Sequence, residues 1–67
     1  MALFVKIYSN DDDYDGIMFN LEAIESVGLN SRRVFTTGSS VPYVIKNDES
    51  WKKILEYVRR NTTEQHF

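Results

Sequence analysis

The residues with the clearest chemical potential form an acidic run near the start of the chain. Asp11, Asp13 and Asp15 alternate along it, Gly16 follows, and Glu22 comes six residues after the glycine. This spacing matches the calcium-loop pattern, in which carboxylate oxygens bind the ion and the glycine allows a sharp turn. An EF-hand, however, needs a helix before this loop, and the preceding residues alternate as a strand does. We expect a solvated acidic hairpin loop with no metal or cofactor. Two alternatives stay open, calcium binding by Asp11, Asp13, Asp15 and Glu22, and an acidic contact surface.

Residue types that support catalysis are scarce in this chain. His66 is the single histidine, it stands one residue from the last position, and there is no cysteine. A nucleophile activated by a histidine, or a cysteine nucleophile, is therefore not expected. No glycine-rich phosphate loop is present, and so short a chain leaves little room for a substrate cleft. We expect a protein that is not an enzyme.

Charge is distributed unevenly along the chain, although the net charge is only −2. Residues 1–31 hold six acidic residues and one basic residue, whereas residues 32–67 hold seven basic and four acidic residues. The candidate basic patch consists of Arg32, Arg33, Lys52, Lys53, Arg59 and Arg60. Phosphate contacts by this patch make nucleic-acid binding an open alternative. The pI near 5.2 favours the other interpretation, a solvated helix face, because nucleic-acid-binding domains are usually strongly basic.

The length of 67 residues indicates one small domain. A domain of this size has a thin stability margin, and without cysteines no disulfide widens it. Association with a partner or with a second copy is one way to gain stability. The apolar stretch over residues 1–5 is too short for a signal peptide or a membrane span. We therefore expect a cytoplasmic protein that is not inserted into a membrane.

The hydrophobic pattern predicts two hairpins followed by a helix. Residues 3–8 alternate as a strand, 9–16 form a turn, and 17–19 return as a second strand. Residues 20–27 are ambiguous, because Asn20 suits the cap of one helical turn and the residues after it suit a strand. Residues 32–37 and 41–46 predict the second hairpin, with Pro42 at the start of its strand or on an edge strand. Residues 49–61 predict an amphipathic helix.

These elements predict an α+β fold, a four-stranded antiparallel β-meander with the C-terminal helix packed on one face. We expect one ββββα domain over residues 1–61 and a frayed tail over residues 62–67. Trp51 begins the apolar side of the helix and is predicted to anchor the core. One helix covers only one face of the sheet, so apolar residues on the other face predict a contact surface. The expected partner contacts are Phe4, Tyr8, Asp11, Asp12, Asp13 and Asp15.

From Asn20 onward the order of features is similar to that of a known family. The segments that carry the similarity are Asn20-Leu21-Glu22-Ala23-Ile24-Glu25-Ser26-Val27, Val34-Phe35-Thr36-Thr37, Tyr43-Val44-Ile45-Lys46 and Ile54-Leu55-Glu56-Tyr57-Val58-Arg59-Arg60. Over about residues 20–61 the chain resembles the FlbD/SwrD family of short cytoplasmic proteins associated with bacterial flagellar operons and motility. The resemblance implies a β-hairpin followed by a final amphipathic helix, and it brings no catalytic residues.

The sequence therefore favours a non-enzymatic protein–protein interaction or regulatory module that also associates with itself through a sheet face or edge. Two alternatives remain. One is a small acidic inhibitor of a host protein, of the kind that phages encode, acting through the loop Asp11 to Asp15. The other is a nucleic-acid binder that uses the basic helix face.

Overall fold

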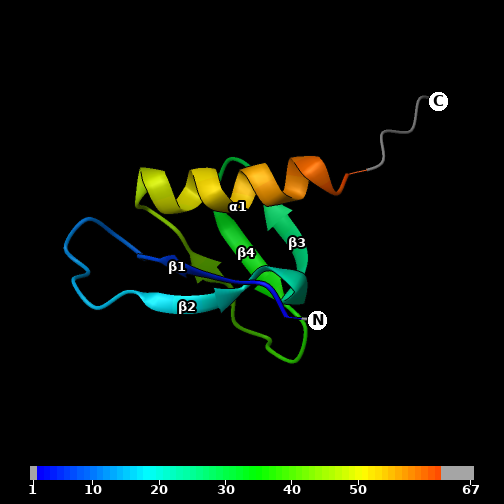
Figure 1. The fold of residues 1–67 in the computed structure, drawn as a ribbon, viewed down its shortest axis with the longest axis horizontal. Coiled ribbons are helices and arrows are strands. Elements are labelled where there is room, and N and C mark those ends of the chain that lie inside the picture. Colours follow the sequence, from blue (N-terminus) through cyan, green and yellow to red (C-terminus); the bar gives the residue numbers. More distant parts are fainter. Residues whose placement is uncertain (1, 63–67) are drawn as a thin grey trace.

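The computed structural model describes residues 2–62, which fold into short strands and one helix (Figure 1). The elements are β1 (Phe4–Ile7), β2 (Ile17–Asn20), a 3-10 turn η1 (Leu21–Ala23), β3 (Ile24–Gly28), β4 (Arg33–Thr36), β5 (Tyr43–Val44) and α1 (Asp48–Arg60). The α+β class is confirmed. Apart from Thr62, the tail predicted over residues 62–67 lies outside the described residues.

The strands form two sheets, so the predicted single four-stranded meander is wrong. β1 and β2 make an antiparallel hairpin, and β3, β4 and β5 make a separate antiparallel sheet in that order. β5 is an edge strand and Pro42 directly precedes it. This is the place where a residue without an N–H donor is tolerated.

The turn η1 is the physical reason for the separation of the two sheets. The Asn20 side chain accepts hydrogen bonds from the backbone N–H of Glu22 at 3.1 Å and of Leu3 at 3.3 Å. The N–H of Leu21 donates to the carbonyl of Leu3 at 2.8 Å, and the Leu21 side chain is buried. The first hairpin therefore ends at this turn. The chain leaves in a new direction, and a bulge at Glu25 bends β3 further.

The helix α1 begins one residue earlier and ends one residue earlier than the pattern predicts. Asn47 is its N-cap, and its side-chain oxygen accepts the backbone N–H of Ser50 at 2.9 Å. Acidic residues occupy the first turn and basic residues occupy the last, the order that the helix dipole favours.

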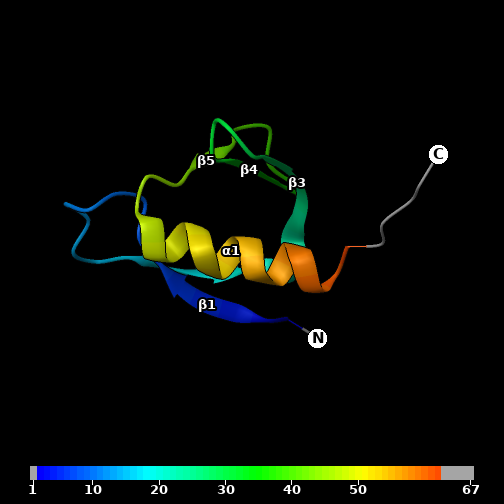
Figure 2. The ribbon, with the colours of Figure 1, turned by 90° about the horizontal axis from the view of Figure 1, so that it is seen from above.

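The helix spans the open side between the two sheets (Figures 1 and 2). One core joins all three elements, and its members are Ile7, Phe19, Leu21, Val34, Ile45, Trp51 and Ile54. The predicted packing of the helix on one face of one sheet is therefore corrected, since β1, β2 and β4 contribute to the same core as α1. Trp51 lies in this core with 6% of its surface exposed.

Candidate interaction surfaces

The acidic loop between β1 and β2 is organised by one carboxylate. Oδ2 of Asp13 accepts hydrogen bonds from the Ser9 backbone N–H at 3.1 Å and from the Ser9 hydroxyl at 3.3 Å. Its Oδ1 accepts the backbone N–H groups of Asp15 at 3.2 Å and Gly16 at 3.1 Å. These donors, Gly16 first, hold the pKa of Asp13 below its ordinary value. Asp13 therefore remains an ionised acceptor that closes the loop.

Gly16 completes this turn because no other residue fits there. Its φ is +68°, and a Cβ atom would lie 2.9 Å from the carbonyl oxygen of Ile7 and 3.0 Å from the Tyr8 ring. Tyr8 is half-buried, and the Lys6 ammonium lies 5.7 Å from its ring centre. Tyr8, predicted as a partner contact, thus packs against the base of the loop.

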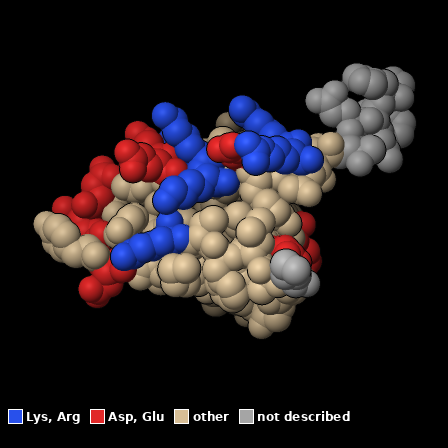
Figure 3. Space-filling view, viewed as in Figure 1, with Lys and Arg blue, Asp and Glu red and all other residues tan. Residues whose placement is uncertain are grey.

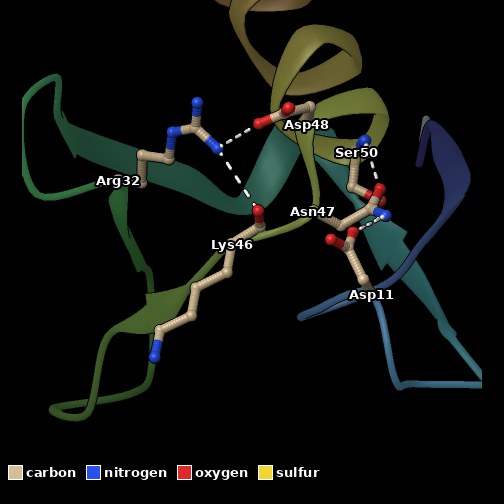
Figure 4. Close-up of polar contacts among 6 residues, drawn as sticks. All are labelled: Asp11, Arg32, Lys46, Asn47, Asp48 and Ser50. Atoms are coloured by element: carbon tan, nitrogen blue, oxygen red, sulfur yellow. Dashed lines mark hydrogen bonds and ion pairs between the residues drawn. The ribbon is translucent and has the colours of Figure 1, made fainter.

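A chain of hydrogen bonds ties the loop to the start of α1 (Figure 4). The Asn47 amide donates to a carboxylate oxygen of Asp11 at 3.0 Å. The Ser50 hydroxyl donates to Asn47 Oδ1 at 2.9 Å and accepts the backbone N–H of Tyr8 at 2.7 Å. Of the predicted acidic contacts, Asp11 and Asp13 therefore stabilise the fold, while Asp12 and Asp15 lie on the exposed side with Tyr14.

The structure does not bring the four residues of the calcium pattern together. The hairpin pairs Ile7 with Ile17 beside the loop and Phe4 with Asn20 at its other end. Glu22 follows Asn20, so about 10 Å of strand separates it from the aspartates. Within residues 2–62, no group of three or more acidic or histidine side chains is placed to hold a metal ion.

We expect no saturable calcium binding tighter than millimolar, because Asp13 is already occupied by four hydrogen-bond donors. Isothermal titration calorimetry with calcium chloride measures this directly. A micromolar site that Glu22→Gln abolishes would show that the loop rearranges to hold the ion.

The predicted basic patch is divided by the fold. Nη1 of Arg32 lies 2.8 Å from a carboxylate oxygen of Asp48 and 3.3 Å from the carbonyl oxygen of Lys46 (Figure 4). The guanidinium also lies over the Trp51 ring, 5.9 Å from its centre. Arg32 has a φ of +54°, a conformation that these contacts hold in place. Arg32 thus braces the turn before β4 against the helix start.

The helix cations are partly engaged as well. Lys53 Nζ donates to the Lys6 carbonyl at 3.1 Å, and Arg60 forms an ion pair with Glu56 at 2.6 Å. Arg33 lies on β4 opposite Val44 and is exposed, whereas the next residue, Val34, is buried in the core with α1. Figure 3 shows most of the visible basic atoms over α1 and many acidic atoms over the loop end, with further acidic atoms among the helix cations and on the side away from the loop.

The exposed apolar face of the first hairpin carries Phe4 and Met18, which are 54% and 63% exposed. Beside it is a cleft of about 320 Å³ between the two sheets. The ring of Phe19 meets that of Tyr43 edge-on at 5.3 Å in this cleft wall. The prediction that Phe4 is available for contact is consistent with this geometry.

A larger groove runs between β3 and the C-terminal half of α1, with a volume of about 760 Å³. Its apolar walls include Ile24, Val27, Leu29, Leu55 and Val58, and its charged lining residues are Glu25 and Arg59. We call this the α1–β3 groove. The sequence did not predict this groove. Leu29 was assigned to a turn, and the ambiguous pattern of residues 20–27 did not indicate a strand with a free edge.

No protein family, curated protein or solved structure matches the chain. His66, the residue weighed for catalysis, lies outside the described residues. Among residues 2–62, the one helix lacks the length and apolar character needed to cross a membrane.

Proposed function

We propose that this protein is a small, non-enzymatic interaction module that binds protein and associates with itself in the cytoplasm. The α1–β3 groove carries the proposal, because a domain with so small a core leaves about 760 Å³ of mainly apolar space open. Exposed apolar surface of this kind, rimmed by charged residues, is typical of interaction sites.

Sedimentation equilibrium from micromolar to millimolar protein tests self-association. We expect a species heavier than 7.9 kDa whose fraction rises with concentration. A single 7.9 kDa species at all concentrations would contradict self-association.

A second candidate, the acidic inhibitor, is supported by the rigidity of the loop. Asp13 holds the turn of the acidic loop, and Asp11 bonds the loop to the N-cap of α1. The exposed residues Asp12, Tyr14 and Asp15 therefore belong to a loop that is held in one conformation. A preorganised acidic surface loses less entropy when it meets a basic partner.

Nucleic-acid binding is less well supported, because Arg32, Lys53 and Arg60 already bond to other groups of the chain. A salt titration of any complex separates the two classes, since phosphate contacts weaken steeply with salt. The role in motility implied by the FlbD/SwrD resemblance is likewise a proposal, and a flagellar gene neighbourhood would support it.

A further inference from the structure

We infer that two copies of this chain pair antiparallel through the free edge of β3, with Leu29 of each copy entering the α1–β3 groove of the other. This inference rests on the proposed self-association and identifies its surface. The argument starts from the edges of the two sheets, because an unpaired strand edge is a template for another strand.

Within residues 2–62, contacts with α1 cover the edge of β1. The N–H of Tyr8 bonds to Ser50 and the carbonyl of Lys6 to Lys53, so α1 caps the edge of β1. The edge of β2 borders the smaller cleft, of about 320 Å³, whereas the edge of β3 borders the α1–β3 groove, which is larger and offers more apolar surface to a second copy.

The edge of β5 is short and protected. β5 has two residues after Pro42, and the N–H of Lys46, just beyond it, bonds to the Ser9 carbonyl at 2.6 Å. Proline and short length are the means by which proteins protect sheet edges.

The edge of β3 has backbone groups available for pairing. The N–H of Ile45 donates to the Arg32 carbonyl at 3.0 Å, so the backbone groups of Arg32 point toward β5. Along β4, the backbone groups of successive residues then point alternately toward β3 and toward β5. Arg33 and Phe35 therefore direct their backbone groups toward β3, where they pair with Gly28 and Ser26. Val27, between these two, directs its N–H and carbonyl away from β4. Within residues 2–62 neither backbone group of Val27 has a hydrogen-bond partner outside the sheet.

A twofold axis at Val27 makes this edge complementary to itself. The two Val27 residues form a hydrogen-bonded antiparallel pair. Leu29, in the turn directly after β3, then lies across from the bulged residue Glu25 of the other copy, two residues or about 7 Å from the axis. Glu25 and Leu29 both line the groove, so the second Leu29 meets its apolar wall. Leu29 is 69% exposed in the single chain, which leaves it free for this contact.

The charges at the groove also suit a second copy. Glu25 belongs to β3 and Arg59 to α1, and both line the groove. An isologous interface repeats every contact, so pairing of Glu25 with the other copy's Arg59 occurs twice. A partner of a single charge sign would satisfy only one of these two residues.

The test compares Leu29→Asp with Val41→Asp by sedimentation equilibrium. Both residues are exposed aliphatic side chains, at 69% and 71%, but only Leu29 lines the groove. We expect Leu29→Asp to weaken the dimer about a hundredfold to ten-thousandfold, because the variant removes two leucine contacts from each dimer, and each is worth about tenfold to a hundredfold. Val41→Asp is expected to leave the dimer unchanged. Circular dichroism of both variants checks that the fold is intact.

Hydrogen exchange of the Val27 amide supplies an independent readout on the unmodified protein. We expect its protection to rise with protein concentration, because the N–H is bonded only in the dimer. If the chain dimerises but Leu29→Asp and the Val27 amide are unaffected, the β3 interface is wrong while self-association stands. If the wild-type chain stays monomeric throughout, both proposals fail.

Discussion

Trp51→Ala leaves the chain largely unfolded at room temperature: this is the largest effect that we expect from a single substitution. Trp51 is 6% exposed and lies in the core that joins both sheets to α1. Truncating a buried tryptophan costs about 3–5 kcal/mol of unfolding free energy. The total stability of a domain this small is often of the same size. The substitution also removes the ring under the Arg32 guanidinium.

Far-ultraviolet circular dichroism with urea titration measures this loss. Lys52→Ala is the matched control, because Lys52 is the next residue on α1 and is exposed. We expect the control to unfold at nearly the wild-type urea concentration. If Trp51→Ala remains fully folded but no longer self-associates, Trp51 acts as a surface contact and its assignment to the core is wrong.

Ser50→Ala is expected to destabilise the fold by about 1–3 kcal/mol. Ser50 is 1% exposed, and its hydroxyl accepts the Tyr8 backbone N–H at 2.7 Å while donating to Asn47. Without the hydroxyl, a partly buried N–H loses its acceptor, and a donor to the helix cap is also lost. No methyl or methylene group is removed from the core, so the cost comes from the hydrogen bonds.

Chemical denaturation of Ser50→Ala is best compared with that of Ser40→Ala, since Ser40 is exposed. We expect Ser40→Ala to change the unfolding free energy by less than about 0.5 kcal/mol. Equal stability of the two variants would show that the Ser50 hydroxyl does not join the first hairpin to α1 in solution.

Local patterns in the sequence predicted individual elements well. The spacing of Trp51, Ile54 and Leu55 located the helix to within one residue at each end. The two interpretations of residues 20–27 both hold in part, because Asn20 caps one 3-10 turn and a strand follows it. Helix ends, caps and single strands depend on residues that are close together in the sequence, so the sequence alone can predict them.

The grouping of strands into sheets was not predictable in the same way. Alternation shows that a segment is a strand, but it does not say which strand it pairs with. The hydrogen bond from the Leu21 N–H to the Leu3 carbonyl is the last of the first hairpin, and η1 then turns the chain away from it. A pattern of apolar and polar residues does not show the direction in which the chain leaves this turn, so the four-stranded meander was the simpler expectation.

The candidate surfaces also could be predicted only where they depend on residues close together in the sequence. The exposed position of Phe4 followed from strand alternation. The internal roles of Asp11, Asp13 and Arg32 did not, since charged residues in a run look alike until their partners are placed. The α1–β3 groove depends on two elements that meet only in the folded chain.

The hydrogen bonds between the first hairpin and the helix also determine how the chain folds. Asp11 and Asn47 are 36 residues apart, and Tyr8 and Ser50 are 42 residues apart. Closing such long loops costs conformational entropy before any contact compensates for it, and a high share of distant contacts slows folding. The core draws Ile7 from the first strand and Ile54 from the helix. During synthesis on a ribosome, the first hairpin therefore cannot complete its core until the helix has emerged.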